Sequence, residues 1–145
     1  MLRRRQLQAA VGAVIVAVGL GASALGASAS SGVTQANASA MPAFNLVTGS
    51  TTWVSGSGFP KSTTVAIVQC NQKVATQGQK ACDISHPIIT HSTVTGRVAA
   101  RAYKVVEGTI GSGTGTGMCD DTHSCFMVIA TLDMSTAGLA TIHFA

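Results

Sequence analysis

The residues with the clearest chemical potential are four cysteines, which fall in two close pairs. Cys70 and Cys82 lie twelve positions apart, and Cys119 and Cys125 lie six apart. Four cysteines in a small exported chain usually form two disulfides, for which three pairings are possible. The short separations favour local bridges over the single long bridge between sheets of an ordinary immunoglobulin domain. Oxidation of all four would leave no thiolate to act as a nucleophile.

The other side chains that could do chemistry are scattered. A zinc site needs three or four ligands in fixed geometry, and His86 and His91 are five apart, which puts them on opposite faces of a strand. The remaining histidines are His123 and His143. We expect all four to be exposed loop residues, and we expect no metal site. The chain also lacks the Gly-x-Ser-x-Gly and His-Glu-x-x-His patterns, so no enzyme activity is expected.

The amino terminus has the layout of a signal peptide. Three arginines, at positions 3–5, precede an uncharged Ala/Val/Gly-rich run over 9–25, and small residues follow. Two Ala-x-Ala sites predict cleavage after Ala29 or after Ala40. We therefore interpret residues 1–40 as signal peptide and short linker, and 41–145 as one domain that is secreted, either freely or in association with the cell wall. An uncleaved leader is the alternative, and only that leader would contact a membrane.

Charge excludes a direct role for the domain in nucleic-acid binding. The formal charge of the whole chain is +4, but three of the nine basic residues lie in the leader. The remaining six basic residues are balanced by five acidic residues, which leaves a net charge of +1. A domain with so small an excess of cations has no basic surface that could neutralise a phosphate backbone.

Short β-rich segments separated by Gly, Ser, Thr and Pro indicate an all-β sandwich of about seven strands. Expected strands cover 44–48, 51–55, 63–70, 88–94, 97–105, 114–119 together with 126–132, and 139–144. The Gly/Thr-rich run 108–117 is either a mobile loop or a strand of small side chains close to another surface. Alternation directs Val54 to the core and Trp53 outwards. An exposed Trp is either a binding hot spot or a ring that rests on a neighbouring loop.

Several short segments resemble the neocarzinostatin family of secreted apoproteins. They are Gly56-Ser57-Gly58-Phe59, Val68-Gln69-Cys70, Ala81-Cys82-Asp83, Cys119-Asp120, Cys125 and the closing run 140–144. The resemblance covers residues 41–145. It implies an immunoglobulin-like, seven-stranded antiparallel β-sandwich with a cleft at one end, and local bridges Cys70–Cys82 and Cys119–Cys125. It also implies a monomeric carrier that holds an enediyne-like or other apolar chromophore non-covalently, with any damage to DNA caused by the chromophore.

The resemblance also implies ligand-binding positions. Gln72 stands where chromophore carriers can have Trp, and Pro87 stands where they have Phe. The full set carried over is Gln72, Pro87, Thr109, Ile110, Phe126, Val128 and Ala130, with Cys70–Cys82 in the cleft floor. Phe126 is the one aromatic side chain expected to stack on a ligand.

Two functions follow. The first is a secreted carrier of a small apolar ligand. The alternative is an exported or cell-wall-associated interaction module that keeps the scaffold, has lost chromophore binding, and uses Trp53 for contact.

Overall fold

The strands follow the alternating sequence pattern. In β4 (Thr64–Cys70), Val65 and Ile67 are fully buried in the core, whereas Val68 joins a separate apolar cluster on the other face. The same alternation holds in β3 (Thr51–Ser57), where Val54 is fully buried and Trp53 is 53% exposed, as predicted. The computed structural model describes residues 32–145, so the predicted cleavage site after Ala29 lies outside the described residues.

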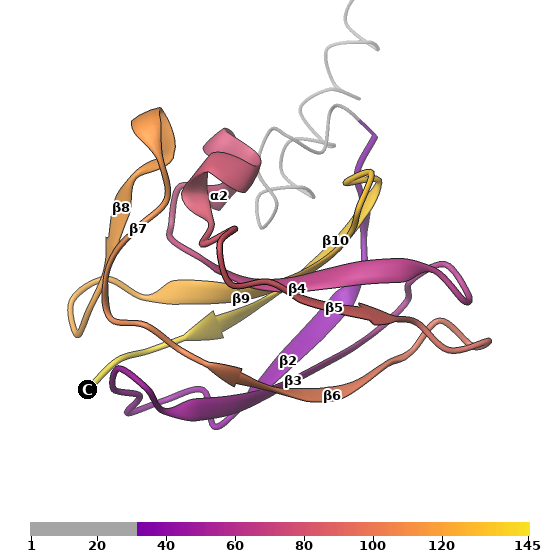
Figure 1. Cartoon of the computed structure of the whole chain (residues 1–145), viewed down its shortest axis with the longest axis horizontal. Helices are drawn as coiled ribbons and strands as arrows, with labels where there is room; N and C mark the ends of the chain where they lie inside the picture. Colours follow the sequence, from indigo (N-terminus) through magenta and orange to yellow (C-terminus); the bar gives the residue numbers. More distant parts are fainter. Residues whose placement is uncertain (1–31) are drawn as a thin grey trace, which may run out of the picture.

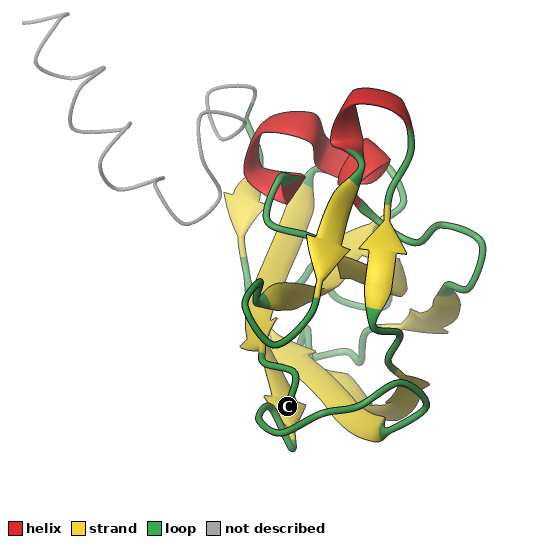
Figure 2. Cartoon of the chain, turned by 90° about the vertical axis from the view of Figure 1, so that its left-hand side faces the viewer, coloured by secondary structure: helices red, strands yellow, loops and turns green. Residues whose placement is uncertain are grey.

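Two sheets face one another across the core (Figures 1 and 2). Sheet A has the order β1-β10-β9-β4-β5 and sheet B the order β2-β3-β6. The bounds not yet given are β1 Thr34–Gln35, β2 Asn37–Met41, β5 Ile88–His91, β6 Val98–Lys104, β9 Cys125–Thr131 and β10 Thr136–Ile142. All pairings are antiparallel except that of β1 with β10. The predicted all-β sandwich is confirmed.

The first strand of the sandwich passes from one sheet to the other. β1 pairs with β10 in sheet A, and after Ala36 the chain continues as β2 beside β3 in sheet B. Gly138 allows this crossing, because a Cβ there would lie 3.0 Å from the Ala36 carbonyl oxygen. Counted as one strand, β1 and β2 complete a seven-stranded sandwich. Residues 34–41 therefore belong to the folded sheets, although the sequence pattern assigns 34–40 to the leader and linker.

The core lies between the inner faces of the two sheets. Its largest fully buried apolar side chains are Leu46, Ile67, Met127, Ile129, Ile142, Val54, Val65, Val98 and Val105. Tyr103 from β6 is also buried there. Burial of branched aliphatic residues from both sheets is the main force that holds a sandwich of this kind together.

Some predicted strands are wrong or shorter than expected. Residues 44–48 form no strand, only an isolated bridge from Leu46 to Phe144, because Asn45 adopts a left-handed backbone (φ 56°) that interrupts an extended chain. The segment 88–94 is strand only to His91, since a turn follows before β6.

The Gly/Thr-rich run is a ribbon packed on other backbone. β7 (Gly108–Ile110) pairs with β8 (Gly117–Cys119), and the short 3-10 helix η3 (Gly113–Gly115) joins them. A Cβ on Gly115 would lie 2.3 Å from the Lys80 carbonyl carbon, so only glycine fits there. The predicted strand over 114–119 is therefore limited to β8.

A third layer covers part of sheet A. It consists of the ribbon β7–β8 and the helical segment α2 (Val74–Gln77) with η2 (Gly78–Ala81), and Figure 1 shows both on the side of sheet A away from sheet B. Across residues 32–145, no helix is long and apolar enough to cross a membrane.

Candidate functional site

The outer face of sheet A, away from the core, is apolar. Along β9, Met127 and Ile129 enter the core, whereas Phe126, Val128 and Ala130 belong to the outer apolar cluster. Alternation along a strand predicts that these three residues share one face, and the structure confirms it. An apolar outer face exposes surface to water unless another element or a ligand covers it.

A groove lies on this face, and we call it the cleft-face groove. Its volume is about 250 Å³. Its lining comes from the strands of sheet A, from α2 and η2, from the loop after Cys82 and from the turn after β9: Ala66, Val68, Val74, Gln79, Cys82, Ile84, Pro87, Ile89, Val128, Ala130, Thr131, Leu132 and Met134. Only Gln79 and Thr131 bring a polar side chain, and none of the lining residues is charged or aromatic.

The floor and the rim of the groove differ in exposure. Val128 and Ala130 form a nearly buried floor. Ile84, Ile89 and Leu132 lie at the rim with more than half of their surface exposed. Three large aliphatic side chains gathered around an apolar depression are typical of a binding site and unusual for an ordinary protein surface.

A disulfide holds the upper wall of the groove in place. Cys70 ends β4 and bonds to Cys82, which closes the loop that carries α2 and η2. The second bridge joins Cys119 to Cys125 across the turn between β8 and β9. The pairing implied by the family resemblance is thus confirmed. The first bridge fixes the position of Val74 over sheet A, because Val74 lies within the closed loop.

Thr109 and Ile110 line a separate depression of about 270 Å³ beside the ribbon. This depression shares Cys82 and Ile84 with the cleft-face groove, so the loop 82–85 is the wall between them. Thr109 is exposed and Ile110 is buried. Of the carried-over positions, Pro87, Val128 and Ala130 lie in the groove, and these two lie next to it.

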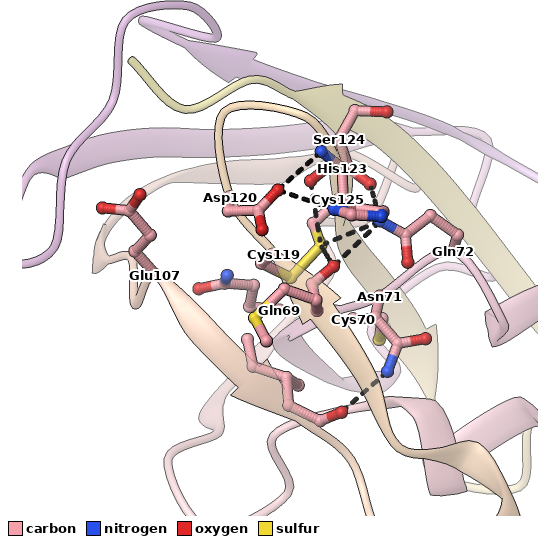
Figure 3. The surroundings of a disulfide bond; sticks show 12 residues. Gln69, Cys70, Asn71, Gln72, Glu107, Cys119, Asp120, His123, Ser124 and Cys125 are labelled. Carbon is pink, nitrogen blue, oxygen red and sulfur yellow. Dashed lines mark hydrogen bonds and ion pairs between the residues drawn. A yellow bond between two sulfur atoms is a disulfide. The ribbon is translucent and has the colours of Figure 1, made fainter.

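The other two positions line neither depression. Gln72 donates from Nε2 to the carbonyl oxygens of Met118 and Ser124, at 2.9 and 2.7 Å, and so connects the end of β4 with the hairpin of the second disulfide (Figure 3). Phe126 is half-buried in the outer apolar cluster, beyond the groove. A role for either in ligand binding stays a prediction.

Two buried amides hold the ribbon against the sandwich. Asn71 donates from Nδ2 to the carbonyl oxygens of Ile110 (2.7 Å) and Gly115 (2.8 Å), and its Oδ1 accepts a bond from the Lys73 N–H (2.8 Å). Gln69 donates to the Val106 carbonyl and accepts from its N–H, at 2.7 and 2.8 Å. Both side chains are almost fully buried. Their hydrogen bonds are therefore strong determinants of where the ribbon lies.

The same local structure follows one cysteine of each bridge, Cys82 and Cys119. Cys82-Asp83-Ile84-Ser85-His86 and Cys119-Asp120-Asp121-Thr122-His123 share the order Cys, Asp, any residue, Ser or Thr, His. In each, the Asp carboxylate binds the hydroxyl and the His Nδ1; the His-to-Asp distances are 3.1 and 2.7 Å. Such side-chain bonds within a turn are a common way to fix a loop.

The electrostatics of these loops follow from the hydrogen bonds. The bond from His123 lowers the pKa of Asp120 to about 2. Partial burial works against the same effect at Asp83, but bonds from Ser85 and His86 still lower its pKa below the usual value. Both carboxylates therefore stay charged at neutral pH.

The Asp83, Ser85 and His86 side chains resemble a hydrolytic triad in composition but not in geometry. Both the Ser85 hydroxyl (2.9 Å) and the Asp83 carboxylate (3.1 Å) approach Nδ1 of His86. In a working triad the hydroxyl and the carboxylate use opposite ring nitrogens, so that the ring can take the hydroxyl proton. In the described part of the chain, no group of three His, Cys, Asp or Glu side chains could hold a metal ion.

Sequence reasoning missed several residues of the groove. Ala66, Val68 and Leu132 could have been found, because alternation puts Ala66 on the face of Val68, and Leu132 on the face of Val128 and Ala130. Val74, Ile84 and Met134 come from irregular segments, whose packing no periodic pattern predicts.

Comparison with known proteins agrees with this architecture. The model of the Neocarzinostatin family matches residues 38–144. The solved structure of macromomycin superposes with a TM-score of 0.60, over 76% of this chain and 99% of the macromomycin chain. The two sequences are 21% identical, and so low an identity shows a shared fold alone. Apokedarcidin, solved in solution, is 28% identical over 76% of this chain and 98% of its own, with a TM-score of 0.49. No curated protein matches. Because the family model covers nearly all of the described residues, the chain belongs to the neocarzinostatin family.

Proposed function

We propose that this protein is a non-covalent carrier that binds a small apolar ligand in the cleft-face groove and does not transform it. The observation that carries the proposal is an almost wholly apolar groove over a nearly buried floor, in a chain of this family. Burial of a ligand's apolar surface there supplies affinity at about 25 cal/mol per Å² removed from water.

The lining favours an aliphatic ligand over a polyaromatic one. None of the lining side chains is aromatic, so a flat chromophore would gain no ring stacking. The volume of about 250 Å³ is below the range of roughly 300–1,000 Å³ found for drug-sized ligands. A dry cavity of about 150 Å³ holds benzene, so this groove suits a branched or cyclic hydrocarbon portion of roughly ten carbon atoms.

Carriage without catalysis is consistent with the polar groups nearby. The one Ser–His–Asp cluster beside the groove uses a single ring nitrogen for both partners. With a net charge of +1 outside the leader, the domain has little attraction for DNA. Any effect on DNA would come from the bound ligand.

We further propose that the protein is exported, acts as a monomer, and loses its leader after Ala29. Cleavage after Ala40 would remove β1 and all of β2 except Met41, and with them one strand of the sandwich. Cleavage after Ala29 leaves both strands intact.

Binding is best tested with matched ligands and matched variants. Native mass spectrometry and calorimetry would compare decanoate with a naphthalene carboxylate, which carries the same charged group on an aromatic body. The rim variant Ile84→Asp would be compared with Val94→Asp. Both side chains are largely exposed, at 62% and 76%, so neither change should affect folding, and Val94 is not among the residues that line the groove.

We expect decanoate to bind more tightly than the aromatic acid, and Ile84→Asp to weaken binding about tenfold, because a charge at the rim opposes burial of the chain. Val94→Asp should bind as the unchanged protein does. Equal affinity of Ile84→Asp and the unchanged protein would place the site elsewhere. Tighter binding of the aromatic acid would contradict the aliphatic specificity.

A further inference from the structure

The outer face of sheet B, on the opposite side of the molecule from the cleft-face groove, carries an exposed aromatic side chain. Trp53 lies in the central strand β3 and is 53% exposed. Its cross-strand neighbours are Met41 on β2, which is 69% exposed, and Ala102 on β6. The small Ala102 leaves the indole uncovered on that side. A large exposed indole in the middle of a regular sheet is a surface that a partner can bury.

A groove lined by hydroxyl-bearing and small apolar residues continues from Trp53 along the same strands, and we call it the sheet-B groove. Its volume is about 490 Å³. It contains Ser39 and Ser55, each two positions from Met41 and Trp53 and therefore on the same face, and it continues to Ser57 and Arg97. Trp53 and Ser57 are four residues apart in β3, which is about 13 Å along a strand.

The groove arises where the sheet is irregular. The register of β3 with β6 shifts between Val54 and Gly56, so that two residues of β6, Ala99 and Ala100, face one residue of β3. Bulges of this kind bend the strand and often lie beside functional sites. Both β6 residues are alanines, which leaves the hollow open instead of filling it.

The chemistry of the lining suits hydroxyl-bearing ligands. The hydroxyls of Ser39 and Ser55 lie 2.9 Å apart and hydrogen-bond to one another on the surface. With Asn37, Ser57 and Thr93 they provide short, neutral donors and acceptors on a rigid sheet.

Charge selects further among such ligands. Arg97 is the only charged residue in the lining, and Arg101 and Lys104 lie on β6. The strands β2, β3 and β6 contain no Asp or Glu, and all five acidic residues of the chain lie elsewhere. An exposed guanidinium without a carboxylate partner is well suited to bind a carboxylate in bidentate geometry.

We propose that the outer face of sheet B binds a carboxylated oligosaccharide, such as a uronic acid chain. One sugar ring packs its apolar C–H face on the Trp53 indole. The next rings extend over the Ser39 and Ser55 hydroxyls, and a carboxylate pairs with Arg97. This site is separate from the proposed ligand carriage, and each can be correct without the other.

The test uses the purified exported protein, without its leader, together with a short oligogalacturonate, its neutral methyl ester, and vesicles of phosphatidylglycerol. Trp53 is the only tryptophan of the chain, so its fluorescence reports on this face directly. Calorimetry supplies the affinity of variants that lack the indole, and circular dichroism checks their fold. The variants are Trp53→Ala, Trp53→Phe and Arg97→Gln, with Lys61→Gln as the control because Lys61 is an exposed cation that does not line the sheet-B groove.

We expect the free acid to bind and to change the Trp53 emission. Trp53→Ala should lose about tenfold or more in affinity, and Trp53→Phe should restore part of the loss. Arg97→Gln should lose about fivefold and should remove the preference for the acid over the ester, whereas Lys61→Gln should have no effect. Equal binding of acid and ester by the unchanged protein, affinity unaltered by Trp53→Ala, or binding to vesicles alone would each overturn the proposal.

Discussion

Replacement of Asn71 by Ala should detach the ribbon β7–β8 from the sandwich. The Asn71 side chain makes three hydrogen bonds of 2.7–2.8 Å to backbone groups, two of them to ribbon carbonyls. A net contribution of about 1 kcal/mol for each bond gives roughly 3 kcal/mol. The two carbonyls left without their partner keep the estimate at about 2–4 kcal/mol, because buried acceptors without a partner are costly.

Denaturant unfolding and amide hydrogen exchange together test this reasoning. We expect the free energy of unfolding to fall by the stated amount and the melting temperature to fall by about 10–15 °C for a domain of this size. Faster exchange should concentrate in residues 108–119. The matched control is Asn37→Ala, since Asn37 is exposed and should contribute less than about 0.5 kcal/mol. A similar loss in both variants, or uniform exchange across the sandwich, would refute the role assigned to Asn71.

Three further predictions concern titration, covalent bridges and processing. Burial raises the pKa of Tyr103, the only tyrosine of the chain, to about 12, so ultraviolet absorbance should show its ionisation near pH 12. The stability gained from the neutral phenol should be fully present below pH 10 and lost as the pH rises through 12. An ionisation midpoint near pH 10 would mean that the ring is exposed. The double variant Cys70→Ser with Cys82→Ser should lose about 3 kcal/mol of unfolding free energy. Cys119→Ser with Cys125→Ser should lose about 2 kcal/mol, because its disulfide closes the shorter loop. A larger loss in the second variant, measured by chemical denaturation, would contradict the dependence on loop length. The intact mass of the exported protein should correspond to a chain that begins at Ser30. A mass that corresponds to a first residue of Met41 would mean that β1 and most of β2 are dispensable.

The sheets could be predicted from the sequence because their residues alternate. Alternation puts Val65 and Ile67 on one face and Ala66 and Val68 on the other, and it directs Val54 to the core. The first strand was missed because residues 34–40 are small or polar and follow an apolar leader, so composition alone assigned them to the linker. Their position depends on contacts with β3 and β10, which are distant in sequence.

The candidate site was only partly predictable for a related reason. Val128 and Ala130 lie in a regular strand and were placed on the correct face. Gln72 was expected in the cleft by position, but its amide is used by the Met118 and Ser124 carbonyls. Side chains of loops are placed by their hydrogen-bond partners, and these partners do not appear in a periodic pattern.

The structure places the buried core on the inner faces of the two sheets, and both proposed binding sites lie on the outer faces. The inner faces bury the aliphatic core, which needs no ligand to be complete. The outer face of sheet A is apolar but only partly covered, and its cover is held by one disulfide and two buried amides instead of by broad apolar packing. Separating such a cover costs a few hydrogen bonds, of about 1 kcal/mol each, and leaves the sandwich intact. Movement of the α2 segment would therefore widen the groove that we propose as the ligand site, while the core stays closed.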